Sequence, residues 1–228
     1  KRLDPERASR PAKSRNVGHN LAPGPLLAAL FSAPSIICAY IGSGLQLLIM
    51  GALIAWMPSF LNRYYGMATE QASLVGAGFV LVGGVGMILC GIVTDRIARR
   101  NPERKWIMAM FYSVVCAILL FVGFHLDAGK AQLLTIAAGT LLAGGTAGPA
   151  SAMVANLTKA AIHATAFATL TLANNLLGLA PGPIVTGMLA DHVGLLEAMR
   201  LVPLAGLGAA VLFFLGKRTY AADLQRLA

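Results

Sequence analysis

The chain has 228 residues, of which 57% are hydrophobic and only 12% are charged, and its formal net charge is +9. Soluble globular domains carry about 25% charged residues, so this composition, with a mean hydropathy of +0.72, excludes an ordinary water-soluble domain. The sequence predicts a protein that lies in a lipid bilayer.

The N-terminal segment differs from the rest of the chain. Residues 1–15 are basic and polar, and an apolar stretch at 26–33 lies between prolines, which leaves it too short to cross a membrane. We expect residues 1–30 to form a cytoplasmic segment with an interfacial lead-in. No cleavable signal peptide is expected, because the basic start has no apolar core behind it. The chain begins with Lys rather than Met, so a fragment, a natural half and a split subunit all stay open.

Six apolar stretches follow, at residues 36–60, 71–93, 106–126, 132–157, 165–190 and 195–216. A helix needs about 20 residues to cross roughly 30 Å of hydrocarbon, and each of these stretches is long enough. Open sheet edges cannot be satisfied in lipid, so we expect helices. The predicted fold is an all-α membrane protein with a six-helix bundle at 31–216 and a cytoplasmic tail at 217–228.

The basic residues indicate how the bundle is oriented. An even number of spans places both termini and the loops after the second and fourth spans on one side, and that side carries these Lys and Arg residues: Lys1, Arg2, Arg7, Arg10, Lys13, Arg15, Arg96, Arg99, Arg100, Arg104, Lys105, Lys159, Lys217, Arg218 and Arg226. Only Arg63, Lys130 and Arg200 lie on the other side. This asymmetry marks the cytoplasmic face, and we interpret the basic run as a segment near anionic headgroups rather than a nucleic-acid site.

Residue types that commonly bind metals or catalyse reactions are sparse. Cys38, Cys90 and Cys116 are widely separated within predicted spans, and His125 and His192 lie at span ends. We expect packing cysteines and solvated histidines, with no metal, no cofactor and no catalytic site.

The second span is rich in small residues. Gly76, Gly83 and Cys90 recur every seven residues, and Ala77, Gly84 and Gly91 form a second stripe beside them. Small residues at this spacing let helices approach closely in lipid, so we expect a tightly packed seam. Whether that seam also slides during function stays open.

Glycine and proline interrupt the last three spans. The interruptions lie at 144–149, which includes Gly148 and Pro149, at Pro181, Gly182 and Pro183, and at Pro203. Each is expected to bend or open its helix, because proline removes a backbone donor. Broken helices commonly border the substrate path of transporters, although a packing kink explains any one of them equally well.

A short sequence echo suggests internal symmetry. Gly91 and Asp95 close the second span, and Gly187 and Asp191 close the fifth with the same spacing on the opposite side. Two inverted three-helix repeats would produce this pattern.

Polar side chains within the spans are the candidates for a substrate cavity. We select Gln46, Asn156, Asn174 and Asn175, with Trp56, and treat Thr140, Thr146, Thr169 and Thr171 as weaker choices. At least one of the adjacent amides of Asn174 and Asn175 is expected to face a cavity or a neighbouring helix. No charged residue lies deep within a predicted span, so we expect any proton-coupling carboxylate to lie outside this chain.

The loop after the second span carries a family resemblance. Gly91, Asp95, Arg96, Arg99 and Arg100 resemble the cytoplasmic loop signature of the major facilitator superfamily, in its position between helices 8 and 9. The resemblance implies helices 7 to 12, with an N-terminal six-helix half as partner. Asp95 would accept hydrogen bonds from Arg96 or Arg99, or lie near a helix N-terminus, and so latch one conformation. A charge cluster that only fixes topology is the alternative.

The stretch from Trp56 to Gly66, the loop at 99–106, and 180–183 with Gly187 and Asp191 are similar to bacterial spinster-like members of that superfamily. This resemblance implies a secondary transporter in the bacterial inner membrane that moves a lipid-like or small organic solute. It overlaps with the organic anion:cation symporters, so small anions also stay open. A non-transporting scaffold or receptor is another alternative. An intramembrane serine protease is disfavoured, since Ile41 replaces the first glycine of a Gly-x-Ser-Gly motif around Ser43 and no span-buried His follows.

Overall fold

The computed structural model describes residues 30–226, and all of its regular secondary structure within that range is helical. The basic segment at 1–15 and most of the predicted interfacial lead-in lie outside the described residues. Six helical stretches are long and apolar enough to cross a membrane, which confirms the predicted number of spans.

Three spans are single helices and three are broken. The single helices are α2 (Pro34–Tyr65), α3 (Thr69–Ala98) and α4 (Arg104–His125). The broken spans comprise α5 (Lys130–Ala143) and α6 (Ala147–Asn156); the short turn η3 (Ala160–Ile162), α7 (His163–Asn174), the π-helical turn η4 (Asn175–Leu179) and α8 (Pro181–Val193); and α9 (Leu195–Leu201) and α10 (Leu204–Gln225).

The breaks lie where glycine and proline predicted them. Pro149 is in the first turn of α6, Pro181 begins α8, and Pro203 directly precedes α10. At a helix start the missing N–H of proline has no intrahelical partner to lose, so each proline begins a new helix at little energetic cost. Pro58, by contrast, lies inside α2, and that helix continues past it.

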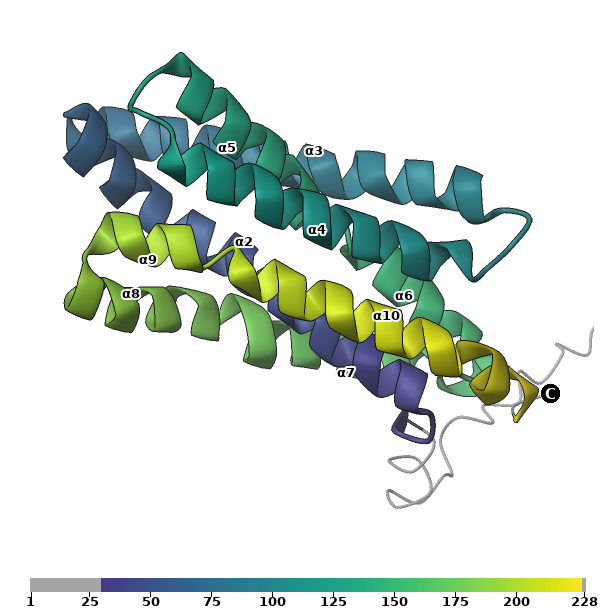
Figure 1. Ribbon diagram of the computed structural model, residues 1–228. Coiled ribbons are helices and arrows are strands. Elements are labelled where there is room, and N and C mark those ends of the chain that lie inside the picture. Colours follow the sequence, from purple (N-terminus) through teal and green to yellow (C-terminus); the bar gives the residue numbers. More distant parts are fainter. Residues whose placement is uncertain (1–29, 227–228) are drawn as a thin grey trace, which may run out of the picture.

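The spans alternate in direction, and their connecting loops gather at two ends of the bundle. Figure 1 shows the C-terminal end of α10, the α3–α4 loop and the α6–α7 loop at one end, with the other loops at the opposite end. The spans form two inverted three-helix repeats, α2 to α4 and α5 to α10. The sixth span continues as helix to Gln225, beyond the end predicted at residue 216.

Helix α2 lies at the centre of the bundle. It contacts α3, α6, α7, η4, α8 and α10, and 72% of its apolar window is buried. The second and fifth spans are the least buried, at 28% and 17% of their windows. These two spans therefore leave the largest apolar faces uncovered by the described chain.

Candidate substrate pocket

A pocket of about 460 Å³ lies between the central helix and the two least buried spans. Residues from α2, α3, α6, α7 and η4 line it: Leu47, Met87, Ala147, Ser151, Phe167, Leu170, Thr171, Asn174, Asn175 and Leu179. The lining is mostly apolar with a few convergent polar groups, which is the usual composition of a small-molecule site.

Close contacts at glycines place the α3 and α6 walls of the pocket. A Cβ atom added at Gly86 would lie 1.8 Å from the carbonyl oxygen of Leu141, and one at Gly145 would lie 3.0 Å from the Sγ atom of Cys90. Glycine thus lets α3 approach α5 and the start of α6, which brings Met87 near Ala147.

The two predicted stripes of α3 differ in their packing. Gly76, Gly83 and Cys90 are buried within the bundle, which confirms the first stripe as a packing seam. Gly84 in the second stripe is exposed, and a Cβ atom there would meet nothing within 4 Å. Other described residues therefore pack against the first stripe of α3, whereas the second stripe is uncovered near Gly84.

The π-helical turn places the two asparagines. The Ala180 N–H donates to the Asn175 carbonyl at 3.0 Å, five residues back, which widens the helix just before Pro181. Glycine lets this turn pack closely against α2, since a Cβ atom at Gly178 would clash with the Gly44 carbonyl oxygen. Asn174 and Asn175 occur where α7 becomes the wider turn, and both line the pocket.

The polar side chains that line the pocket are uncharged, and one of their acceptor atoms has no hydrogen-bond partner. Asn175 Nδ2 donates to the Thr171 carbonyl at 2.8 Å, and the hydroxyls of Ser151 and Thr171 donate to carbonyls of their own helices at 2.9 Å. The Oδ1 atom of Asn174 is buried without a hydrogen-bond partner. Leaving a buried acceptor unpaired costs about 1–3 kcal/mol, so this atom lacks a hydrogen-bond donor that the described residues do not supply.

Three other predicted cavity residues lie outside the pocket lining. Gln46 is fully buried, and neither of its amide atoms has a hydrogen-bond partner. The Asn156 amide donates to the Tyr220 hydroxyl at 3.3 Å, and Trp56 Nε1 donates to the Pro183 carbonyl at 2.9 Å. These side chains join the helices of the bundle to one another or fill its interior. Of the predicted set, Asn174, Asn175 and the weaker choice Thr171 line the pocket.

Several lining residues escaped the sequence analysis. Leu47, Met87 and Phe167 are apolar residues in spans that are apolar all round, so no pattern marks the side on which they lie. Ser151 carried a usable signal, because it lies one helical turn after Ala147 at the 144–149 break.

The predicted loop motif lies at the end of α3, apart from the pocket. The Tyr112 hydroxyl on α4 donates to the Cys90 carbonyl at 3.1 Å and is 3.1 Å from Thr94 Oγ1, which fixes this end of α3. Asp95, Arg96, Arg99 and Arg100 are exposed. Within residues 30–226, Asp95 has no hydrogen bond or ion pair, so the contact with Arg96 or Arg99 is not formed in this conformation.

The echoed motif lies at the other end of the bundle. Asp191 is exposed near the end of α8, and a Cβ atom at Gly187 would lie 2.9 Å from the Trp56 ring. The nearby His192 and the distant His125 each bond a carbonyl of their own helix through Nδ1, at 2.8 and 2.7 Å. Among the described residues no group of three His, Cys, Asp or Glu side chains is arranged to hold a metal ion.

Known proteins share this architecture. A crystal structure of a bacterial homolog to the human lysosomal transporter Spinster, inward-facing and unoccupied, superposes with a TM-score of 0.77 at 16% identity. The match covers 94% of this chain and 53% of that one. The same homolog in its inward-facing, occupied conformation gives a TM-score of 0.71.

Sequence relatives agree with the fold. An MFS-type efflux pump of Mycolicibacterium smegmatis is 25% identical over 167 residues, which is 72% of this chain and 38% of the relative. The probable sphingolipid transporter spinster homolog 2 of Arabidopsis thaliana is 27% identical over 146 residues, which is 64% of this chain and 30% of the relative. The chain thus spans about a third of the length of these relatives.

The sequence model of the Major Facilitator Superfamily matches residues 2–180 and 39–225, which together take in nearly the whole chain. This match agrees with the six spans, the inverted repeats and the spinster-like relatives. The chain belongs to the major facilitator superfamily.

Proposed function

We propose that this chain forms helices 7 to 12 of a secondary active transporter that moves a lipid-like or small organic solute by alternating access. The observation that carries the proposal is the pocket of about 460 Å³ on the least buried side of the bundle, which is lined by Asn174, a residue whose Oδ1 atom has no hydrogen-bond partner. Broken helices border this pocket on two sides, as is common at transporter binding sites.

A second six-helix half is the proposed partner. The second and fifth spans are 28% and 17% buried in their apolar windows, so they leave apolar faces on both sides of the pocket. The exposed Gly84 offers close backbone approach there. A second half packed on these spans would turn the open pocket into a closed central cavity.

The lining chemistry favours an amphipathic, lipid-like substrate. Leu47, Met87 and Phe167 offer apolar surface, and Asn174 with Thr171 offers hydrogen bonds without charge. The lining contributed by the described residues contains no cationic side chain, which disfavours the organic anion:cation alternative. Two of the relatives, a probable sphingolipid transporter and an efflux pump, agree with this class.

The loop motif is proposed as a conformational latch. Asp95 and the arginines Arg96, Arg99 and Arg100 are exposed at one end of α3, so they are free to contact a helix end of the second half. In the proposed orientation this end and both termini are cytoplasmic, and the membrane is a bacterial inner membrane. The breaks at Gly148 and Pro149, and at Pro181, Gly182 and Pro183, are the proposed points of bending, with Gly187 and Asp191 at the opposite end.

Transport in proteoliposomes tests the proposal. The chain is reconstituted together with its N-terminal half, and the movement of a fluorescent sphingosine and of ethidium is followed under an imposed proton gradient. We expect gradient-dependent movement of at least one probe. Absence of movement for both probes, in a protein that is folded and oriented, would favour a scaffold or receptor.

A further inference from the structure

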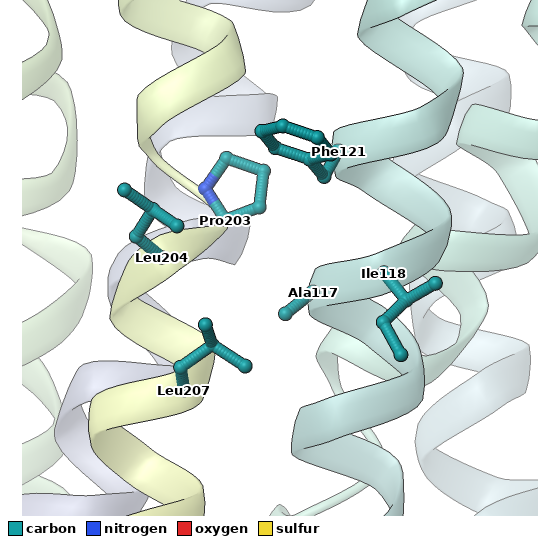
Figure 2. A pocket seen from close by; sticks show the side chains of 6 residues that line it. All are labelled: Ala117, Ile118, Phe121, Pro203, Leu204 and Leu207. Atoms are coloured by element: carbon teal, nitrogen blue, oxygen red, sulfur yellow. The ribbon is translucent and has the colours of Figure 1, made fainter.

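A second pocket, of about 280 Å³, lies between α4 and α10 on another side of the bundle. Its lining is entirely apolar and consists of Ala117, Ile118, Phe121, Pro203, Leu204 and Leu207. Figure 2 shows Phe121 and Ala117 of α4 facing Pro203 and Leu207 across it. Pockets for drug-sized ligands begin at about 300 Å³, so this one has room for a single hydrocarbon chain rather than a whole lipid.

The break before α10 shapes this pocket. Between α9 and α10, Val202 and Pro203 keep helical backbone angles, but the α-helical hydrogen bonding gives way to a tighter turn, in which the Ala205 N–H donates to the Val202 carbonyl at 3.1 Å. Ala117, which lines the pocket opposite this turn, is too small to fill the space. Nearby the same two helices touch closely, since a Cβ atom at Gly206 would lie 3.0 Å from the Ser113 carbonyl oxygen. The pocket is therefore held open between a tight contact and a broken helix.

The pocket opens toward the surroundings of the bundle. Ile118, Phe121, Leu204 and Leu207 keep 53%, 44%, 47% and 44% of their surface exposed. Neither α4 nor α10 contributes a residue to the substrate pocket. Under the proposed function, the second half covers α3 and the fifth span, so the α4–α10 face meets lipid.

Charged groups lie near the end of this pocket that Pro203 and Phe121 form. Arg200, three residues before Pro203, donates from Nε to the Phe124 carbonyl at 3.0 Å and forms an ion pair with Glu197. Their side chains are 25% and 52% exposed. Phe121 stacks on His125 at the end of α4, with ring centroids 4.2 Å apart. A cation and an anion thus lie side by side near the apolar α4–α10 pocket.

We propose that the α4–α10 pocket binds one acyl chain of a zwitterionic phospholipid, phosphatidylethanolamine, from the leaflet at the α8–α9 end of the bundle. The phosphate accepts from the remaining N–H groups of Arg200, and the ammonium group donates to Glu197. Charge complementarity favours this headgroup. An anionic lipid has no ammonium group to donate to Glu197, so its negative charge would lie near that carboxylate without compensation.

Photolabelling tests the chain-binding part. The chain with its N-terminal half is placed in nanodiscs that contain phosphatidylethanolamine with a diazirine in its acyl chain, and labelled peptides are mapped after irradiation. We expect label to concentrate on the peptides of Phe121 and Leu207. Leu207→Trp, which fills the pocket, should reduce that label to background. Leu215→Trp, at a residue of α10 with similar 45% exposure outside the pocket, should leave it unchanged.

Headgroup variants test the charge-complementarity part. In competition between phosphatidylethanolamine and phosphatidylglycerol, Glu197→Gln should lower the preference for the zwitterionic lipid by about two- to fivefold, as expected for exposed ion pairs. Arg200→Gln should weaken the labelling by both lipids. Even labelling along α4 and α10, no difference between the two tryptophan variants, or a wild-type preference for phosphatidylglycerol would overturn the proposal.

Failure of this lipid-binding proposal is distinguishable from failure of the proposed function. If the second half covered the α4–α10 face instead of lipid, diazirine labelling at Phe121 would be absent while transport of the fluorescent probes continued. If the protein were not a transporter, transport would be absent while the lipid label at this pocket remained.

Discussion

The indole nitrogen of Trp56 on α2 donates a 2.9 Å hydrogen bond to the carbonyl oxygen of Pro183 on α8. The same ring lies against Gly187, where a Cβ atom would come within 2.9 Å of it. One side chain thus joins the central helix to the first turn of α8, which begins with Pro181 shortly after the π-helical turn. The contact helps to hold the start of α8 against α2.

Replacing Trp56 by Phe should separate this positioning role from simple packing. The variant loses a hydrogen bond of roughly 0.6 kcal/mol in a membrane bundle, so its unfolding midpoint should fall only slightly. Its transport rate should change by a larger factor than this small loss of stability would produce, because the hydrogen bond to the Pro183 carbonyl no longer holds α8. Trp106→Phe is the control, since the buried Trp106 nitrogen makes no hydrogen bond, and transport should persist there despite a loss of stability.

A buried carboxylate joins the first and last spans of the bundle and should contribute strongly to stability. Asp223 on α10 is 2% exposed and accepts from the Ser35 backbone N–H at 3.1 Å and from the Ser35 hydroxyl at 2.6 Å, at the start of α2. Asp223→Ala should destabilise the protein by about 1.5–3 kcal/mol, because the hydrogen bonds involve a charged group. Thermal unfolding in nanodiscs measures this; Asp127→Ala, at an exposed loop position, should shift the midpoint little.

The buried face of α3 that carries the packing seam should be intolerant of one added methyl group. Gly86→Ala would place a Cβ atom 1.8 Å from the backbone oxygen of Leu141, which forces the helices apart. Overpacking of this kind costs typically about 1–3 kcal/mol, so folded yield and unfolding midpoint should both drop. Gly78→Ala on the same helix meets nothing within 4 Å and should be neutral. Equal behaviour of the two variants would contradict the observed seam.

Asn174 should affect substrate affinity more than any other predicted polar residue. Asn174→Leu keeps the side-chain size and removes the unpaired acceptor, and loss of one hydrogen bond of 0.5–1.5 kcal/mol corresponds to a rise in KM of about two- to twelvefold. Asn156→Leu is the matched control, since Asn156 bonds Tyr220 outside the pocket. Concentration-dependent transport of the fluorescent sphingosine gives both KM values, and a larger effect at Asn156 would refute the assignment.

The sequence predicted the fold more completely than the site. Apolar length and the positions of Gly144, Pro181 and Pro203 were sufficient for six spans with breaks in the last three, because membrane thickness and proline chemistry act locally. The continuation of α10 to Gln225 escaped prediction, since the residues after Gly216 are polar and hydropathy marks only the part of a helix that lies in hydrocarbon.

The site depends on which way each side chain faces, and spans that are apolar all round do not encode this in their pattern. Asn174 was identified because an amide is costly in lipid, and it lines the pocket. The same reasoning selected Gln46 and Asn156, which the tertiary structure instead places in the buried interior and beside Tyr220. The sequence does not mark Asp223, because its role depends on Ser35, 188 residues away in the chain.

Cysteine accessibility at Ser151 tests the central claim most directly. Ser151 is replaced by Cys in the chain joined to its N-terminal half, with Cys38, Cys90 and Cys116 changed to Ala, and a membrane-impermeant maleimide is applied from each side in turn. Alternating access predicts labelling from both sides, slowed by excess sphingosine, while a Leu207→Cys control stays unlabelled in its lipid-facing pocket. A Ser151 position that no aqueous reagent reaches from either side would contradict a substrate path through this pocket.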